Sequence, residues 1–255
     1  MRELLESVAA GELSIEQAEA ELAGYATGET GRFDAARGSR TGVPEVILAA
    51  GKTPEETASM AALAVETTDR AIVTRVDSPT AAAIEDRLAQ AHPEATIDHT
   101  DRSETLVIHG PSFDPPTLDA DVGIVTAGTS DAGPAGEAAT IVSEMGAHLT
   151  RIDDVGVAGI ARLIDRLELC RSQDVLIVAA GREGALPTVL AGLVDVPLIG
   201  LPVSNGYGYG GDGRAALSGM LQSCTPITVV NIDAGFTAGA QAGLIARGFD
   251  TARSD

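Results

Sequence analysis

Residues 181–224 read GREGALPTVLAGLVDVPLIGLPVSNGYGYGGDGRAALSGMLQSC and contain, in order, a helix start, an apolar strand, a glycine-rich loop and a cysteine. Glycines crowd the segment 200–213 beyond what ordinary turns require. Glycine permits positive φ angles and lets a ligand approach the backbone closely. Because ligands of open α/β sheets bind at the carboxyl ends of the strands, this segment predicts a small-molecule site after the strand that begins at Val196.

Strands and helices alternate around this segment. The predicted strands are 122–126, 148–152, 175–180, 196–201 and 228–231, and the predicted helices are 134–146, 156–170, 184–194 and 213–222. Helices of this length between strands indicate right-handed β-α-β units in a parallel sheet. We therefore expect an α/β fold, a three-layer sandwich with a mainly parallel, Rossmann-like sheet.

A smaller α/β domain is predicted before this sheet. Three prolines in residues 111–116 indicate a boundary, which gives an N-terminal domain at 1–110 and a catalytic domain at 117–255. In the first domain we expect helices at 2–10, 14–24, 53–67 and 78–91, strands at 46–50, 71–74, 96–99 and 105–109, and an ordered loop at 26–43. Ser14 with Gln17 forms a capping-box pattern, and Thr53 precedes Pro54 as an N-cap.

Composition excludes several classes of function. The chain of 255 residues has 17 basic and 37 acidic residues, a net charge of −20, and only 3% aromatic residues. This charge argues against binding to nucleic acid or anionic membranes, and it predicts an acidic, solvated surface. The start, MRELLESVAAGELS, lacks the basic and apolar regions of a signal peptide, and no apolar run is long enough to span a membrane. We expect a cytoplasmic protein with reduced thiols.

The loop after the strand 122–126 carries candidate binding residues. Gly128, Thr129, Ser130 and Asp131 precede a predicted helix, and backbone amides with hydroxyl groups at a helix start form a ready anion site. The alternative is an ordinary N-cap at Ser130 or Asp131. The usual phosphate-binding glycine motifs are absent.

The loop after the strand 175–180 places an acid at the same edge. Glu183 follows Gly181 and Arg182, and a carboxylate there suits a general base or a metal ligand. The alternative is a favourable interaction of Glu183 with the helix dipole. Arg182 would pair with a phosphate or with neighbouring side chains.

The two cysteines differ in their surroundings. Cys170 continues an apolar helical face and is predicted to be part of the core, whereas Cys224 lies just past a predicted helix. Cys224 is either a nucleophile or another buried thiol. A helix C-terminus disfavours a thiolate, so activation of Cys224 would require a nearby cation.

Other polar residues carry weaker signals. Arg37, Arg40 and Lys52, the sole lysine, are candidates in the N-terminal domain, although a lone lysine is usually a solvated charge. The four histidines do not cluster, so spacing leaves any metal site unknown.

Several motifs together resemble one family. GKTPEE (51–56), VTAGTSD (125–131), the segment 181–202, NGYG (205–208), LQSC (221–224) and VVNIDAGF (229–236) resemble the LarB family of nickel-pincer cofactor carboxylases. The second domain more distantly resembles the PurE-type aminoimidazole ribonucleotide (AIR) carboxylases, whose loop reads GSxSD where this chain has AGTSD.

The resemblance implies a reaction. The LarB enzyme carboxylates C5 of the pyridinium ring of nicotinic acid adenine dinucleotide and hydrolyses its phosphoanhydride, giving pyridinium-3,5-biscarboxylic acid mononucleotide and AMP. Thiolate addition at C4 makes C5 nucleophilic, and the positively charged ring would stabilise that thiolate. CO2 or bicarbonate is the co-substrate, no tightly bound cofactor is implied, and Mg²⁺ is a candidate ion. A homo-oligomer, an octamer by analogy, is also implied.

Roles for residues follow from the same resemblance. Cys224 would be the nucleophile, and Glu183 would act in hydrolysis or proton transfer. Ribose or phosphate would be held by Thr129, Ser130 and Asp131, and the pyridine ring would be covered by Gly206, Tyr207 and Gly208, with Ser204 beside them. The chain departs from the family at Arg182, usually apolar, at Asn205, often valine, and at Pro134, displaced by one position.

Two other functions remain open. One is AIR carboxylation in purine biosynthesis, which requires no thiol and whose histidine loop has no match here. The other is a non-catalytic nucleotide-binding sensor.

Overall fold

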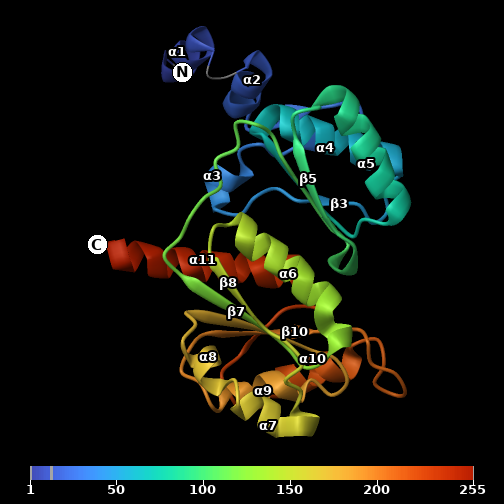
Figure 1. Cartoon of the computed structure of the whole chain (residues 1–255), viewed down its shortest axis with the longest axis vertical. Coiled ribbons are helices and arrows are strands. Elements are labelled where there is room, and N and C mark those ends of the chain that lie inside the picture. The colour runs from blue at the N-terminus through green and yellow to red at the C-terminus, as the bar shows by residue number, and fades with distance from the viewer. Residues whose placement is uncertain (1, 12–13, 255) are drawn as a thin grey trace. The chain divides into compact units, whose positions relative to one another are not determined.

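The chain divides into two compact units, Met1–Asp114 and Pro115–Asp255. The computed structural model describes residues 2–11 and 14–254. The first unit contains a four-stranded sheet and a two-stranded ribbon, and the second contains a five-stranded sheet (Figure 1). No helix of the described residues is long and apolar enough to cross a bilayer.

The N-terminal unit is a small α/β unit with a mixed sheet. Its helices are α1 (Arg2–Ala10), α2 (Ile15–Ala23), α3 (Arg37–Thr41), α4 (Pro54–Thr68) and α5 (Ser78–Ala91), with a 3-10 turn η1 at Asp101–Ser103. Its strands are β1 (Ala26–Thr27), β2 (Arg32–Phe33), β3 (Ile47–Leu48), β4 (Arg70–Thr74), β5 (Thr96–Thr100) and β6 (Thr105–His109). The sheet order is β3-β4-β6-β5, with β3 parallel to β4 and the other pairs antiparallel.

Local capping explains where the helices of this unit begin. The Thr53 side chain accepts a hydrogen bond from the Glu56 backbone, and the Glu56 side chain accepts one from the Thr53 backbone. Ser14 and Gln17 make the same reciprocal pair at the start of α2, as their spacing predicts. Such caps satisfy amides that have no partner within the helix.

The segment 26–43 is more regular than the predicted loop. Its first part forms the antiparallel ribbon of β1 and β2, and its last part forms α3, which ends at Gly42 with a φ of 77°. These elements are too short to produce a periodic sequence pattern, so the prediction of an ordered loop at 26–43 did not include them.

The C-terminal unit has an all-parallel sheet. Its strands are β7 (Asp121–Thr126), β8 (His148–Ile152), β9 (Val175–Ala180), β10 (Leu198–Pro202) and β11 (Thr228–Val229). Its helices are α6 (Ala132–Glu144), α7 (Ile160–Ile164), α8 (Leu167–Arg171), α9 (Ala185–Ala191), α10 (Arg214–Leu221) and α11 (Gly235–Ser254), with 3-10 turns η2 (Thr129–Asp131) and η3 (Val157–Gly159). The fold class is the predicted one, an α/β protein whose main sheet is parallel.

The sheet of this unit is the middle of three layers, with helices on both of its faces. Alternate side chains of β9 point to opposite faces, with Ile177 packing in the cluster that includes α6 and α11 and Val178 in the cluster that includes α9. Figure 1 shows α6 and α11 on one face of the sheet and α7, α9 and α10 on the other. A sheet covered on both faces needs continuous apolar strands, which β9 supplies with every residue buried.

The strand order β11-β10-β9-β7-β8 locates a switch point. β7 lies between β8 and β9, so the chain leaves β7 toward one edge of the sheet and later returns past it toward the other. Crevices form at such points, outside the carboxyl ends of the strands.

The long C-terminal helix α11 is absent from the predicted elements. Gly235, Gly239 and Gly243 recur every four residues and form one stripe along it. A Cβ at Gly239 would overlap the Ala138 carbonyl of α6, and one at Gly243 would overlap Met145. The two helices therefore pack too closely for side chains on this stripe.

Other helices of the C-terminal unit differ from their predicted bounds. The predicted helix 156–170 is divided into η3, α7 and α8, because Gly159 and Arg166 adopt non-helical backbone angles. The predicted helix 184–194 is the shorter α9.

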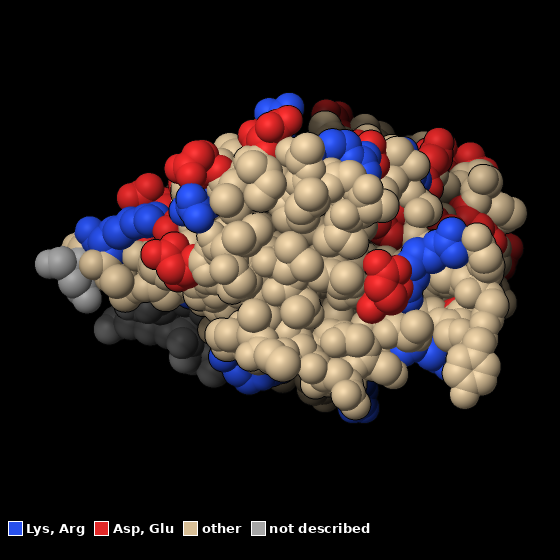
Figure 2. Space-filling view, turned by 90° about the horizontal axis from the view of Figure 1, so that it is seen from below, with Lys and Arg blue, Asp and Glu red and all other residues tan. Residues whose placement is uncertain are grey.

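The charge of the chain is unevenly spread. Figure 2 views the molecule from the side on which Figure 1 shows α7 and α9, and uncharged side chains fill the centre of this face. Exposed apolar residues on the helices of this layer include Ile160, Ile164 and Leu221, the last 66% exposed. The predicted acidic surface does not extend across this face.

Candidate functional site

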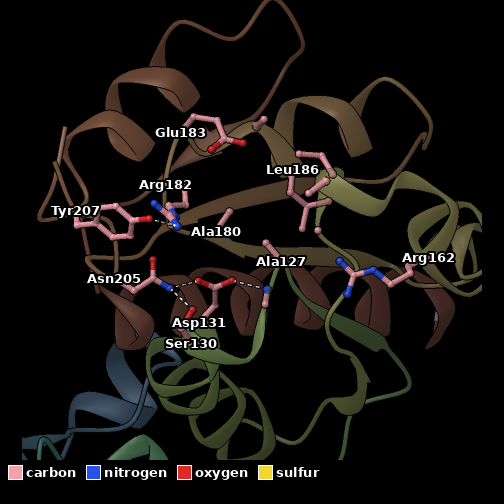
Figure 3. A pocket seen from close by; sticks show the side chains of 16 residues that line it. Ala127, Ser130, Asp131, Arg162, Ala180, Arg182, Glu183, Leu186, Asn205 and Tyr207 are labelled. Atoms are coloured by element: carbon pink, nitrogen blue, oxygen red, sulfur yellow. Dashed lines mark hydrogen bonds between the residues drawn. The ribbon is translucent and has the colours of Figure 1, made fainter. Parts of the chain in front are cut away.

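A pocket of about 460 Å³ lies at the switch point of the parallel sheet. It is lined by residues that follow β7, β8, β9 and β10, so four loops contribute to it. Figure 3 shows Ser130 and Asp131 on one side, Arg182 and Tyr207 beside them, and Arg162 across the pocket.

The loop after β7 forms a closed corner around Asp131. The Gly128 amide donates to Oδ2 of Asp131 at 2.8 Å, and the Asp131 amide donates back to the Gly128 carbonyl at 3.1 Å. Asp131 is only 3% exposed, and its side chain makes no capping hydrogen bond to α6. Its carboxylate therefore holds the loop rather than the helix start.

Asn205 joins this corner to the loop after β10. Its Nδ2 donates to Ser130 Oγ at 2.7 Å and to Asp131 Oδ1 at 2.5 Å. Burial raises the pKa of Asp131 above its ordinary value, while the hydrogen bonds from Gly128 and Asn205 oppose that shift. The corner thus holds a carboxylate whose ionisation depends on these donors.

The oxygen atom of the Asn205 amide explains why residue 181 is a glycine. Oδ1 of Asn205 is buried and has no hydrogen-bond partner among the residues that the structure describes, and it occupies the place that a Cβ on Gly181 would take. A side chain at residue 181 would therefore have to displace this amide.

The loop after β9 presents Arg182 and Glu183 in a tight turn. The Gly184 amide donates to the Gly181 carbonyl at 2.9 Å, and Arg182 and Gly184 both have positive φ angles, 53° and 67°. Helix α10 packs directly on this turn, because a Cβ at Gly219 would overlap the Glu183 carbonyl. Glu183 lines the pocket and its side chain is exposed.

Arg182 and Tyr207 form a pair at the pocket wall. The guanidinium carbon of Arg182 lies 3.9 Å from the centroid of the Tyr207 ring, and Nη2 donates to the Tyr207 hydroxyl at 2.9 Å (Figure 3). Tyr207 is 75% exposed. The pair is a cation–π contact with a hydrogen bond at the edge of the ring.

Sequence reasoning missed Arg162, on the far side of the pocket. It lies on α7 and pairs with Asp154 at 2.7 Å. A Cβ at Gly156 would overlap the Ala127 carbonyl, so the loop after β8 lies directly against the loop after β7. The signal was present, since Asp153, Asp154 and Gly156 follow a predicted strand and belong to the carboxyl edge.

The pocket brings together only some of the predicted site residues. It is lined by Gly128, Ser130, Asp131, Gly181, Arg182, Glu183 and Tyr207. Thr129, Ser204, Gly206 and Gly208 are not part of the lining. The Ser204 amide instead donates to Asp233 at 2.9 Å, which fixes the start of the glycine-rich loop.

Cys224 is exposed and does not line this pocket. Its neighbour Thr225 donates through Oγ1 to the Thr188 carbonyl of α9 at 3.4 Å. The segment after α10 therefore lies beside α9, and a shared site for Cys224 and Glu183 stays a prediction. Cys170 is fully buried, as predicted, and burial raises the pKa of its thiol.

The N-terminal candidates are engaged within their own unit. Arg37 pairs with Glu45 at 2.9 Å and Arg40 with Asp34 at 2.6 Å, and the hydrogen bond from Arg40 lowers the pKa of Asp34. Lys52 donates to the Leu48 carbonyl at 2.6 Å. A binding role for these residues stays a prediction.

A metal site has no preformed ligand set in this part of the chain. Within residues 2–11 and 14–254, no three His, Cys, Asp or Glu side chains gather as ligands. Any Mg²⁺ would need oxygen ligands from the substrate as well as from the protein.

Comparisons with known proteins cover nearly the whole chain. Residues 25–109 match the family described as the LarB/PurE-like N-terminal domain, and residues 121–252 match the AIR carboxylase family. An uncharacterized protein of Methanocaldococcus jannaschii is 38% identical over 258 residues, which cover 97% of both chains. The crystal structure of a Treponema denticola PurE2 variant matches with a TM-score of 0.43 and 23% identity, covering 51% of this chain and 82% of that chain.

Proposed function

Since the chain belongs to the LarB/PurE-like family, with an N-terminal LarB/PurE-like domain followed by an AIR carboxylase domain, we propose that it carboxylates C5 of the pyridinium ring of nicotinic acid adenine dinucleotide and cleaves its phosphoanhydride. The products are pyridinium-3,5-biscarboxylic acid mononucleotide and AMP. The observation that carries the proposal is the pocket at the switch point, which combines two carboxylates, two guanidinium groups and an aromatic ring.

The polar groups of the pocket suit this substrate. Arg182 and Arg162 line opposite sides, as Figure 3 shows, and a dinucleotide carries anionic groups at separate places along its length. Tyr207 is exposed and its ring already holds the planar Arg182 guanidinium, so the ring would also attract a planar cation such as pyridinium. The pocket therefore offers cationic groups for the anionic parts of the proposed substrate and an aromatic side chain for its ring.

The proposed reaction begins with a covalent bond between Cys224 and the ring. The Cys224 thiolate adds to ring C4, and the electron pair that neutralises the ring nitrogen makes C5 an enamine carbon. C5 then attacks CO2, a base removes the C5 proton, and loss of the thiolate from C4 restores the pyridinium ring. Water cleaves the phosphoanhydride. Glu183, exposed at the pocket, is the proposed base for proton transfer or hydrolysis.

The position of Cys224 limits how the proposed active site can be formed. Because Cys224 lies outside the pocket lining of its own chain, its thiol must reach the ring from a second copy or by movement of the segment 222–227. We propose a homo-oligomer, and the exposed apolar side chains Ile160, Ile164 and Leu221 on α7 and α10 support it, since exposed apolar surface favours association.

A mixing experiment separates these two routes. The Cys224→Ala and Glu183→Gln chains are each expected to be inactive, and exchange of their subunits restores activity only if one site uses residues from two copies. Restored activity supports the shared site, and no restoration after verified exchange supports movement within one chain.

AIR carboxylation is the second candidate. The match of residues 121–252 to that family and the position of Cys224 outside the pocket favour it. The test is to incubate the wild type and Cys224→Ala with bicarbonate and either nicotinic acid adenine dinucleotide or aminoimidazole ribonucleotide, and to measure product masses. We expect a carboxylated mononucleotide and AMP from the dinucleotide, made only by the wild type. Carboxylation of the imidazole by both proteins would instead establish the second candidate.

A further inference from the structure

Arg182 contacts a tyrosine, whereas several other arginines of the chain form ion pairs with carboxylates. The arginines with a carboxylate partner include Arg37, Arg40, Arg151, Arg162, Arg171 and Arg253. Among the described residues, no carboxylate lies within ion-pair distance of Arg182. In a chain with a net charge of −20, a guanidinium without an acidic partner at a pocket wall is available to an anionic ligand.

The backbone at Arg182 presents this side chain to the pocket. Its φ of 53° lies in the left-handed region, which a residue with a Cβ seldom adopts. The turn between Gly181 and Gly184 imposes that angle, and such unfavourable angles cluster at ligand sites.

Tyr207 is the aromatic partner of Arg182 at the pocket wall. The guanidinium lies 3.9 Å from the ring centroid, so the ring face already holds a planar cation. A ligand ring with a positive charge would be attracted to Tyr207 for the same electrostatic reason. If that ring also carries a carboxylate, the carboxylate and Arg182 form a charge-assisted pair.

We propose that Arg182 and Tyr207 together select a pyridinium ring bearing a carboxylate over one bearing a carboxamide. This inference rests on the proposed function and specifies how its site distinguishes the nicotinic acid form of the dinucleotide from the nicotinamide form. The ring lies on Tyr207, and the guanidinium rotates from the ring face to the carboxylate. Both side chains are exposed, so this rotation requires no unfolding.

Arg162 provides a matched control. It lines the same pocket from the other side, but it already pairs with Asp154 at 2.7 Å. A phosphate contact at Arg162 would serve both forms of the dinucleotide equally, because they differ only at the ring substituent.

The experiment measures equilibrium binding of both dinucleotides by calorimetry, without bicarbonate, to the wild type, Arg182→Gln, Arg182→Lys and Arg162→Gln. The wild type is expected to bind the acid form about 10- to 100-fold more tightly, the range expected of a charge-assisted hydrogen bond. Arg182→Gln should weaken the acid form alone and bring the two affinities within about threefold, with Arg182→Lys between them. Arg162→Gln should weaken both forms and keep their ratio.

Two results would overturn the inference. One is equal weakening of both forms by Arg182→Gln, and the other is a wild type without preference or without binding. The outcome is distinct from that of the proposed reaction, because binding is measured without a co-substrate. A wild type that prefers the acid form through Arg182 but makes no carboxylated product would retain the selection and reject the carboxylation.

Discussion

The amide nitrogen of Asn205 lies 2.5 Å from Oδ1 of Asp131, although 74 residues separate them along the chain. Asn205 also donates to Ser130, and its own oxygen lies against Gly181. One amide therefore connects the loops after β7, β9 and β10, which are the loops that form most of the pocket.

Asn205→Val should destabilise the protein in a pH-dependent way. Burial raises the folded-state pKa of Asp131, so ionisation opposes folding, and the stability from the protonated form is lost as pH rises through that pKa. Loss of the Asn205 donor raises the pKa further. The destabilisation by Asn205→Val should therefore grow from acidic to neutral pH in urea unfolding experiments. A constant difference across pH would contradict this coupling, and Asn231→Val, at an exposed amide outside the pocket, is the control.

Gly181→Ala should also disturb the hydrogen bonds of Asn205, by displacing its side-chain oxygen. The new Cβ would take the position of Asn205 Oδ1, so the amide must leave Ser130 and Asp131. We expect a loss of about 1–3 kcal/mol in the free energy of unfolding. At Gly206, the nearest atom to an added Cβ is 3.5 Å away, so Gly206→Ala is the matched control with a smaller effect. Equal effects of the two substitutions would argue against the clash.

Gly239→Ala tests the close packing of α11 on α6. An added Cβ would overlap the Ala138 carbonyl and lie 2.9 Å from Cβ of Ile141. Overpacking of this kind costs about 1–3 kcal/mol. Gly248→Ala, in the same helix with no atom within 4 Å of its added Cβ, should instead stabilise by about 0.5–1 kcal/mol. The measurement is urea unfolding of the two variants. Destabilisation by both would contradict the claim that Gly239, and not Gly248, is held in close contact with α6.

The two cysteines should react differently with a thiol reagent. Cys224 is exposed, whereas Cys170 is fully buried with a raised pKa. Native protein should therefore be labelled at Cys224 alone, and denatured protein at both sites, as peptide mass spectrometry can verify. Rapid native labelling of Cys170 would show that the α7–α10 layer is more open than the structure indicates.

Local patterns predicted the parts of the fold that depend on neighbouring residues. The N-cap at Thr53, the apolar strand β9 and the parallel sheet follow from short-range spacing and periodicity. Helix α11 was not predicted, because glycine and alanine occupy its buried stripe and give only a weak apolar pattern in the sequence. The stripe is recognisable only once α6 is seen to pack against it.

The candidate site was predictable only in outline. The carboxyl-edge rule located Ser130, Asp131, Arg182 and Glu183 because each follows a predicted strand. Asn205 acquires its partners only when strands distant in sequence become neighbours.

The most direct test of the account is the absorbance spectrum of the wild type mixed with nicotinic acid adenine dinucleotide in the absence of bicarbonate. Addition of the Cys224 thiolate to ring C4 converts a pyridinium into a dihydropyridine, which absorbs at longer wavelength. We predict that a new near-ultraviolet band appears with the wild type, disappears when bicarbonate is added, and is absent from Cys224→Ser. A carboxylated product formed equally well by Cys224→Ser would contradict the proposed covalent mechanism.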